Sequence, residues 1–592
     1  MALILASGQA KDRLAESTLP ASEGFGPVWR LTDGQHWLLV GDANAEPGQA
    51  EENQLGWRVG LYGYLANSAA VARLLNHPPD QPQANQADLV ACLLNEQGPD
   101  GLHALTGNFV VLAGDTQSGQ VLAFRDRLGG RTLYFSENQS GLLLATRAGW
   151  VARMDNKPFE LDPIFISGHF SSQPAPPPGL TPFSGITELM PGECLVLADE
   201  KLTRTRRELN LTSEFDYRDP ADCIARFGEL FEQSVAATLP AEGNVACMLS
   251  GGLDSGPMAI LADRLLAEKS RRLVVTSWQL PAYPEADEGE WISQVMGELR
   301  QPAELFDGSP MRPFDRLDEL MICAELPFYN AFRPLVLNCY RLAAEADCRV
   351  VLNGNAGDEL YAPRRLLNLD RLRRRHFKPL WRDLVSIWRA AGLRSVLADA
   401  AFRHPIGRLI PRRRRPRPPH WLTDHGRKHW QAPEIWPEEC ADAAWPEYAW
   451  QLVGSRMAYG RAHENPFPNQ FGVDRRDPFH NEALVRFMLN APMSLSHKGG
   501  ADKWIMRMAM RGILPNPVRK KARTGLLHSF FEAGLTANRP ALRQLLFEQQ
   551  TGWQRYVKPD IVAAVLDGKD AAPVILLASC VGHALWERRW QR

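Results

Sequence analysis

The sequence has little that ties the protein to a membrane, a structural metal or a polyanion. No apolar run approaches the ~18 residues that a membrane span needs. The nine cysteines form no Cys-x-x-Cys pair and have no histidine at zinc spacing, so we expect free thiols in a reducing compartment. The 67 basic and 68 acidic residues nearly cancel. We therefore expect a cytoplasmic protein with no membrane or nucleic-acid partner.

The two commonest nucleotide-binding fingerprints are also missing. The sequence contains no G-x-x-x-x-G-K-[ST] segment, whose lysine reaches the outer phosphates of a nucleotide. It also contains no G-x-G-x-x-G segment of the kind that binds a dinucleotide. A phosphate site in this chain therefore needs a different loop.

The pattern of apolar residues changes once along the 592 residues, which correspond to two to four domains at about 150 residues per domain. The first part predicts short strands between turn residues, at 37–40, 57–64, 107–113, 121–125, 132–135 and 142–145. The second part alternates helices with short apolar strands, which indicates a parallel sheet covered on both faces. Its helices are expected at 225–238, 258–267 and 335–346, and its strands at 245–249, 273–278 and 349–352. We place the two domains at 1–210 and 211–592.

An arginine-rich insertion lies at about 363–436 and includes the runs 371–375 and 412–417. Basic runs are usually solvated surface. The alternative is a local site for an acidic peptide or a partner protein, and the sequence leaves both interpretations open.

The strongest chemical signal lies where an expected strand meets an expected helix, at 245–269. The strand ends in two adjacent glycines, whose missing side chains let backbone N–H groups turn toward an anion. The helix that follows presents its positive dipole end to the same place. A plain glycine turn would not explain the flanking serines and aspartate. The segment therefore predicts a pyrophosphate cradle formed by Ser250, Gly251, Gly252, Asp254 and Ser255.

This loop resembles that of the ATP pyrophosphatases, and specifically that of the asparagine synthetase superfamily. Members of that group cleave ATP between the α- and β-phosphates, form an acyl-adenylate on a carboxylate and release pyrophosphate when an amine attacks. The resemblance implies ATP and Mg²⁺ as cofactors. It also implies that Leu249 and Ser277 contribute to the ATP site and that Asp254 is a ligand of the magnesium ion.

Three later segments support the resemblance. Residues 353–360 are similar to the family's Ser-Gly-x-Gly-x-Asp-Glu segment, which implies that Gly354 and Gly357 lie at the ATP and that Asp358 is the second magnesium ligand. Residues 472–481 look like the Pro-Phe-Leu-Asp region, with His-Asn where Leu-Asp is usual. Residues 503–507 and 514–515 follow the order Lys-x-x-x-Arg and Leu-Pro, which implies that Lys503 contacts the leaving phosphates.

The first domain resembles the glutamine amidohydrolase domain of asparagine synthetases at 105–109, 125–129 and 133–135. The resemblance implies an α/β/β/α Ntn-amidohydrolase-like domain in front of a doubly wound ATP pyrophosphatase domain. In that amidohydrolase the nucleophile is an N-terminal cysteine, whereas position 2 is Ala2 and the first cysteine is Cys92. Alanine cannot form a covalent intermediate. We expect a scaffold domain and an amine that does not come from glutamine.

The family includes asparagine synthetases, β-lactam synthetases and the cyclases that close the ring of lasso peptides. We favour the lasso peptide cyclase, an ATP-dependent ligase that joins a side-chain carboxylate of a core peptide to the N-terminal amine of the same peptide. The arginine-rich insertion and the 17 tryptophans suit a peptide substrate better than a small amino acid. A leader peptidase is the expected partner. A β-lactam-type or ammonia-dependent synthetase and a non-catalytic peptide-binding scaffold remain as alternatives.

The general base is less well defined by the sequence. The position where asparagine synthetases carry glutamate and β-lactam synthetases carry tyrosine is Asn355, and an amide does not accept a proton usefully near neutral pH. Glu464 lies roughly where the β-lactam enzymes place the glutamate of their catalytic pair. The intermediate-stabilising cation is expected among Lys520, Lys521 and Arg523, and we favour Lys521. His463 is as well explained by a surface position as by proton transfer. The pair Asp287 and Glu288 resembles the family's Asp-Glu pair after the adenine-contacting strand, and an exposed helix start with acidic residues at its positive end explains it equally well.

Overall fold

The structure is a computed structural model. It describes residues 3–7, 9–16, 29–32, 37–41, 45–49, 56–76, 85–139, 141–155, 160–171, 176–207, 209–210, 212–301, 303, 305–317, 319, 325–361, 364–373, 375–397, 417–432, 455–498, 501–521, 525, 527–549, 551–569 and 574–590. The expectations for Ala2, Arg523 and arginines 412–415 therefore concern positions outside the described residues. No helix within the described ranges is long and apolar enough to cross a bilayer.

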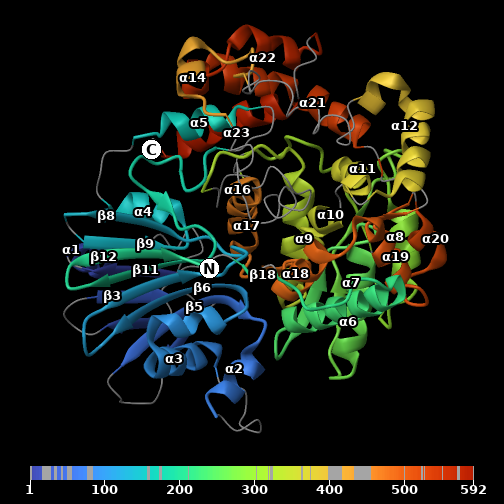
Figure 1. Cartoon of the computed structure of the whole chain (residues 1–592). Coiled ribbons are helices and arrows are strands. Elements are labelled where there is room, and N and C mark those ends of the chain that lie inside the picture. The colour runs from blue at the N-terminus through green and yellow to red at the C-terminus, as the bar shows by residue number, and fades with distance from the viewer. Residues whose placement is uncertain are drawn as a thin grey trace.

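Two antiparallel six-stranded sheets form the N-terminal domain, shown in blue and cyan in Figure 1. The first sheet has the order β10 (Thr187–Glu188), β8 (Tyr134–Asn138), β9 (Gly141–Ala145), β1 (Leu3–Ser7), β3 (Trp37–Gly41), β2 (Trp29–Thr32). The second has the order β12 (Lys201–Arg206), β11 (Glu193–Ala198), β7 (Val121–Arg125), β6 (Gly107–Asp115), β5 (Trp57–Leu65), β4 (Ala45–Gln49). The strands expected from the sequence are all present.

The alternation of side chains along β6 explains how the layers pack. Val110 and Leu112 join Leu5 and Leu144 in the core between the two sheets, while Phe109 and its alternate neighbours face the opposite way. That outer face is covered by α2 (Ser68–Leu74) and α3 (Gln86–Gln97), and the first sheet is covered by α1 (Gln9–Glu16) and α4 (Ala148–Met154). The predicted α/β/β/α architecture is confirmed.

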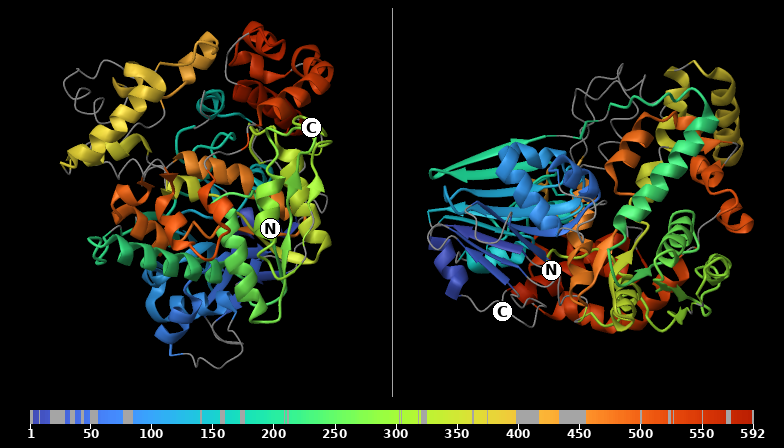
Figure 2. Two further views of the ribbon diagram at one scale, coloured as in Figure 1. Left: turned by 90° about the vertical axis from the view of Figure 1, so that its right-hand side faces the viewer. Right: turned by 90° about the horizontal axis from the view of Figure 1, so that it is seen from below.

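A four-stranded parallel sheet organises the C-terminal domain, in the order β14 (Leu273–Val275), β13 (Asn244–Cys247), β17 (Cys348–Leu352), β18 (Asp474–Arg476). Val245 of β13 packs with α6 (Pro220–Thr238) and α7 (Ser255–Ala267), and Ala246 belongs to the core that contains α9 (Arg333–Glu345). Both faces of the sheet are therefore covered by helices, as the strand and helix alternation predicted. Figure 2 shows this sheet beside the N-terminal sheets.

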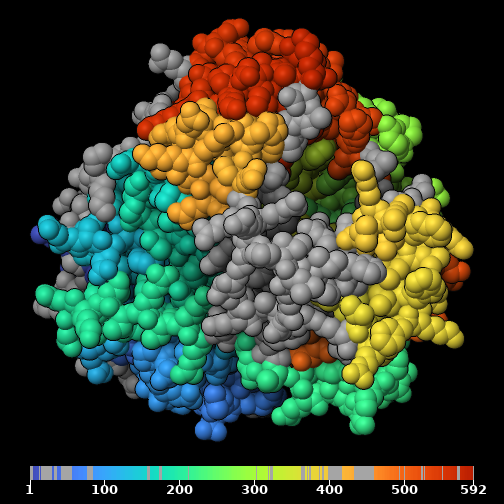
Figure 3. All heavy atoms as spheres, turned by 45° about the horizontal axis from the view of Figure 1, so that its top comes forward, coloured from blue at the N-terminus to red at the C-terminus, as the bar shows by residue number. Residues whose placement is uncertain are grey.

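The arginine-rich insertion begins with two helices, α11 (Arg364–Arg373) and α12 (Phe377–Leu397), which stand out in yellow at one side of the molecule in Figure 3. Arg371 is buried and forms an ion pair with Asp383 of α12, so this part of the basic run holds the two helices together. Trp381 and Trp388 of α12 are 71% and 56% exposed. The insertion is thus partly structural and partly an exposed aromatic surface.

The C-terminal helices fold back onto the N-terminal domain, an arrangement that the sequence did not predict. Helix α23 (Val574–Trp590) is almost entirely buried and packs near α5 (Pro163–His169) at the top of Figure 1. The carbonyl of Ser579 lies 3.2 Å from the imidazole of His169, and Trp586 packs against Phe183. The last helix therefore ties the two domains together.

Buried ion pairs also join the domains. Glu325 accepts hydrogen bonds from the Nε of Arg147 and from the backbone N–H of Gly149, each at 2.6 Å. Arg127 donates to both carboxylate oxygens of Glu482 at 2.9 to 3.1 Å. Charged partners that are this deeply buried depend on one another, because an unpaired buried charge is strongly destabilising.

We expect Glu325→Ala to destabilise the protein by roughly 3–5 kcal/mol, because it leaves the buried guanidinium of Arg147 without its carboxylate. Urea unfolding followed by tryptophan fluorescence measures the effect. The matched control is Glu345→Ala, which removes an exposed Arg341 to Glu345 pair and should cost roughly 0.3–0.5 kcal/mol. Equal midpoints for the two variants would contradict the role of Glu325 at the domain interface.

Candidate active site

The loop after β13 has the backbone geometry that its glycines predicted. Gly251 has a φ of +61°, and a Cβ on it would lie 2.7 Å from the Cβ of Trp291. A side chain at this position would therefore require both a strained backbone and a displaced tryptophan. Helix α7 begins at Ser255, and no side chain caps its N-terminus. The turn and the helix start thus present backbone N–H groups at one place.

Serine hydroxyls fix the shape of this loop. The Oγ of Ser255 accepts from the backbone N–H of Ser250 at 2.9 Å and lies 3.0 Å from the Oγ of Ser250. The hydroxyl of Ser277 donates to the carbonyl of Leu249. Ser250 is exposed, whereas Ser255 and Ser277 are buried. Of the three predicted hydroxyl groups, that of Ser250 is the one that faces solvent, and the other two hold the turn.

Lys503 joins the two aspartates predicted to share a cation. Its Nζ forms an ion pair with Asp254 and lies 2.6 Å from Oδ1 of Asp358. Asp254 precedes α7 and Asp358 lies in α10 (Gly357–Tyr361), so the two carboxylates come from segments about a hundred residues apart that leave adjacent strands. Burial raises the pKa of Asp254 to about 6, although Lys503 opposes this shift. Burial also works to lower the pKa of Lys503, but Asp254 and Asp358 outweigh it and raise that pKa.

The two glycines of the second segment make room for these carboxylates. A Cβ on Gly357 would lie 2.7 Å from the Cγ of Asp254, and a Cβ on Gly354 would lie 3.3 Å from the Cβ of Asp254. Position 357 therefore requires glycine because any side chain there would collide with Asp254. The turn at 354–358 thus packs against the loop at 250–255, called the phosphate loop below, and this close approach explains the spacing of its glycines.

The aspartates fit a magnesium ion that is shared with phosphate oxygens. Among the described residues no group of three or more His, Cys, Asp or Glu side chains could hold a metal ion by itself. Mg²⁺ commonly takes only one or two carboxylates and completes its shell with waters and substrate phosphates. The Oδ1 of Asp254 is buried without a hydrogen-bond partner, so this oxygen is available to coordinate a cation. Asp254 and Asp358 are thus a suitable pair of ligands.

The structure separates the candidate cations near the C-terminal motif. Lys521 has its Nζ 2.8 Å from Oε1 of Glu288 and 3.4 Å from the carbonyl of Gly251, and it lies over the ring of Trp291. Lys520 is exposed. Lys521 therefore reaches the phosphate loop, and Glu288 is the residue that holds it there.

Glu464 and the turn at 354–358 line one cavity of about 260 Å³. Oε1 of Glu464 lies 3.4 Å from a guanidinium nitrogen of buried Arg333, and the side chain is 27% exposed. His463 points elsewhere: it is buried against Tyr329 and Tyr459, and burial holds its pKa well below the ordinary value. Glu464 is thus at the site, and His463 is a core residue.

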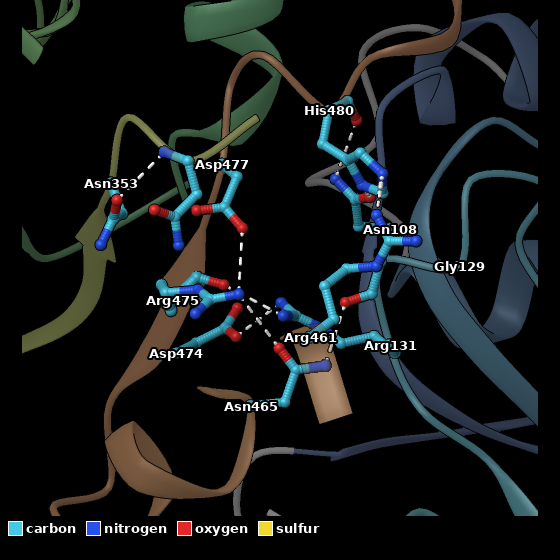
Figure 4. A network of polar contacts seen from close by, with 12 residues as sticks. Asn108, Gly129, Arg131, Asn353, Arg461, Asn465, Asp474, Arg475, Asp477 and His480 are labelled. Atoms are coloured by element: carbon cyan, nitrogen blue, oxygen red, sulfur yellow. Dashed lines mark hydrogen bonds and ion pairs between the residues drawn. The ribbon is translucent and has the colours of Figure 1, made fainter. Parts of the chain in front are cut away.

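Several polar residues of this cavity were not predicted from the sequence. Its wall also contains Arg461, Arg475, Asp477 and His480, which belong to the network drawn in Figure 4. In this network His480 reaches Asn108 of the N-terminal domain at 2.6 Å. For His480 the sequence gave one signal, the departure from Leu-Asp at 480–481. The other residues gave none, because single polar residues in a helix or strand show no pattern that marks them as neighbours in space.

A glycine turn, two aspartates and a lysine gather at the carboxyl ends of parallel strands, which is where open α/β sheets bind ligands. The fold thus defines an α/β domain built on a parallel sheet and attached to an antiparallel four-layer domain. Comparison with known families gives the particular group. The profile described as asparagine synthase matches residues 226–591, and the profile described as glutamine amidotransferase domain matches residues 73–207. The chain belongs to the asparagine synthase family, with an N-terminal domain of the class-II glutamine amidotransferase type.

Individual relatives are distant. The glutamine-hydrolyzing asparagine synthetase 3 of Bacillus subtilis strain 168 is 26% identical over 273 residues, which cover 44% of this chain and 44% of that protein. Amidase chry2 of Gibberella zeae is 26% identical over 192 residues, or 32% of this chain and 28% of that protein. The chain thus spans less than half the length of these relatives.

Similarity to solved structures is weaker still. The glutamine phosphoribosylpyrophosphate amidotransferase of B. subtilis is 15% identical with a TM-score of 0.22, and the match covers 46% of this chain and 59% of that chain. A class-II glutamine aminotransferase domain protein of Silicibacter pomeroyi is 11% identical with a TM-score of 0.21, and the match covers 35% of this chain and 99% of that chain.

The raised pKa of Asp254 predicts a pH-dependent stability difference. Because the pKa rises from 3.8 to about 6, protonated Asp254 contributes stability that is fully present below pH 3.8 and is lost as the pH rises through about 6. Asp254→Asn cannot ionise and should melt roughly 2–4 °C above the wild type at about pH 8, with a smaller gap at about pH 4.5. Scanning calorimetry across this range measures the gap.

The control is Asp358→Asn, because the side chain of Asp358 is 78% exposed and burial penalises its charge little. A melting difference for Asp254→Asn that does not change between the two pH values would refute the burial explanation.

Proposed function

We propose that this protein is an ATP-dependent amide ligase that activates a carboxylate as an acyl-adenylate and then joins it to an amine. The observation that carries the proposal is the contact of Lys503 with Asp254 and Asp358 beside the glycine turn. In this arrangement Ser250, Gly251 and Gly252 hold the outer phosphates of ATP through N–H and O–H donors. Membership of the asparagine synthase family supports the same reaction class.

The two aspartates and Lys503 divide the task of charge control. Asp254 and Asp358 would hold Mg²⁺, which supplies positive charge beside the phosphates. Lys503 is partly buried, its pKa is raised by the two aspartates, and it is positioned to donate to the departing pyrophosphate when a phosphate displaces it from the carboxylates. Fixed charges that are already oriented stabilise a developing anion without further rearrangement. This division requires all three residues.

We infer that the amine is not released from glutamine by the N-terminal domain. The residue in front of β1 is Ala2, where the related amidohydrolases carry the nucleophilic cysteine. Among the described residues of this domain the cysteines are Cys92, which lies on the covering helix α3, and Cys194, whose pKa burial raises to about 12. A thiol needs a lowered pKa to act as a nucleophile, and Cys194 has the opposite.

The substrate that we favour is a peptide that is closed into a macrolactam, as in lasso peptide formation. The peptide's N-terminal amine would attack the adenylated side-chain carboxylate of an Asp or Glu in the same molecule. Holding the two groups together is worth up to roughly 7–11 kcal/mol of the barrier. The exposed tryptophans of α12 and the basic insertion support a peptide. A leader peptidase is the partner that we propose for this pathway.

We expect Asp254→Ala and Lys503→Met each to lower ATP-dependent pyrophosphate release by about 10²–10³-fold, because the phosphates lose a charged partner. The assay incubates protein, ATP and Mg²⁺ with candidate substrates and records pyrophosphate. Activity that depends on a leaderless core peptide supports the cyclase. Turnover with aspartate and ammonium would instead favour an ammonia-dependent synthetase, and turnover with a β-amino acid would favour a β-lactam-type enzyme. A near-normal rate for Asp254→Ala would contradict the phosphate site.

Lys521 and Lys520 provide a matched pair of neighbouring lysines. We expect Lys521→Met to slow amide formation at least about tenfold, because its ammonium is held at the phosphate loop by Glu288. Lys520→Met should leave the rate within about twofold, because this side chain is exposed. Single-turnover measurement of product formation separates the two variants. Similar rates in both would remove Lys521 from the site.

A further inference from the structure

The cavity beside the turn at 354–358 contains an unusual buried arginine. Arg461, in α16 (Ser455–Glu464), is only 6% exposed and lines this cavity of about 260 Å³. Its Nη1 lies 2.7 Å from Nε2 of His480. Its Nε and Nη2 are buried without a hydrogen-bond partner. Two of the donor sites on this guanidinium are therefore left without an acceptor.

The other buried arginines around Arg461 each have a carboxylate. Within the described residues the pairs are Arg125 with Glu188 at 2.7 Å, Arg131 with Asp474 at 2.6 Å and Arg475 with Asp477 at 3.2 Å. The partly buried Arg476 pairs with Asp474 at 2.8 Å. No ion pair of this kind joins Arg461 to a carboxylate among those residues. An unpaired cation in a buried position is unfavourable unless an anion arrives to match it.

Arg461 remains charged although it is buried. Burial and then the nearby Arg125 lower its pKa to about 10, against the weaker attraction of Asp126, Glu188 and Asp477 beyond ion-pair distance. A pKa of about 10 keeps the guanidinium protonated at neutral pH. The cavity wall therefore holds the charged guanidinium of Arg461, with two donor atoms that lack an acceptor, beside carboxylates at other points of the lining.

A chain of hydrogen bonds from the N-terminal domain holds Arg461 in place (Figure 4). Burial keeps the pKa of His480 well below its ordinary value, so the ring is neutral at pH 7. Its Nδ1–H then donates to Oδ1 of Asn108 at 2.6 Å, and its Nε2 accepts from Arg461. The Nδ2 of Asn108 donates to the hydroxyl of Tyr64 at 2.7 Å and to the carbonyl of His480 at 3.1 Å.

We propose that Arg461 binds a carboxylate of the acyl substrate in this cavity, and that Asn108 is a positioning residue that orients Arg461 through His480. This inference rests on the proposed amide-ligase function, because Asp358 and Glu464 line the same cavity. A guanidinium matches a carboxylate with two parallel N–H donors, and Arg461 has its Nε and Nη2 free for that geometry. The amidotransferase-like domain thus contributes a part of the ligase site without any chemistry of its own.

The test measures binding of succinate, a small dicarboxylate, to the full-length protein without ATP by isothermal titration or saturation-transfer NMR. Arg461→Gln is expected to weaken succinate binding at least tenfold, and Arg461→Lys to weaken it less, because lysine keeps the charge but not the fork. Neutral succinamide should bind the wild type at least tenfold more weakly than succinate. Unchanged succinate binding in Arg461→Gln, or equal binding of succinamide, would overturn the proposal.

The half-amide succinamate distinguishes the source of the carboxylate. Binding equal to that of succinate means that Arg461 takes a single carboxylate, such as the one that is activated. Much weaker binding means that the substrate brings a second carboxylate as well. Both results support the assignment of Arg461.

Asn108→Leu tests the positioning residue. We expect it to weaken succinate binding about fivefold while ATP affinity stays unchanged, a split that general loss of structure would not produce. The control is Glu482→Gln, which disturbs another contact between the same domains and should leave succinate binding within about twofold. Equal weakening in both variants would reduce Asn108 to an interface contact. Because succinate binding needs no ATP, these results are independent of pyrophosphate release by Asp254→Ala, so the two proposals can fail separately.

Discussion

The contact of one lysine with two aspartates is the interaction on which the rest of the site depends. Asp254 and Asp358 carry like charges and leave neighbouring strands of the parallel sheet, so without Lys503 they would repel each other. Lys503 itself adopts a left-handed backbone conformation with φ of +53°, which places it directly in front of the helix that it begins. A left-handed backbone costs conformational energy, and such residues persist where the surrounding structure fixes the direction of the side chain.

The N-terminal domain is joined to the C-terminal domain by several side-chain contacts. It reaches the C-terminal domain through ion pairs and through the contact of Asn108 with His480. Within its own domain Asn108 lies so close to Gly130 that a Cβ on Gly130 would be 2.1 Å from Oδ1 of Asn108. The last helix closes the arrangement by packing back onto the same domain. The N-terminal domain therefore supports the wall of the cavity through the contact of Asn108 with His480.

Among the described residues several buried charged side chains have an atom without a hydrogen-bond partner, and two of them, Asp254 and Arg461, lie where a ligand is proposed. Oδ1 of Asp254 and two nitrogens of Arg461 are buried without partners, and Arg461, unlike the neighbouring Arg475, has no carboxylate at ion-pair distance among the described residues. Buried polar groups are otherwise nearly always hydrogen-bonded, and burying a charge without a partner is costly. Asp254 has one oxygen without a partner although Lys503 pairs with the other, and Arg461 has a positive charge without a carboxylate at ion-pair distance in the adjoining cavity. These unsatisfied atoms lower the stability of the unliganded protein, and a bound ligand would satisfy them.

The sequence by itself determined the two-domain order, the expected strands of both domains and the phosphate loop, because periodicity of apolar residues and glycine turns are local properties. Through segments that resemble those of a known family, it also made Asp254, Asp358 and Lys503 candidates for one site. Only the tertiary structure distinguished Lys521, which contacts Glu288, from Lys520. It also showed that His463 lies in the core and that His480 connects Asn108 to Arg461. Those outcomes depend on which surfaces pack together across hundreds of residues, and no local pattern records such a contact.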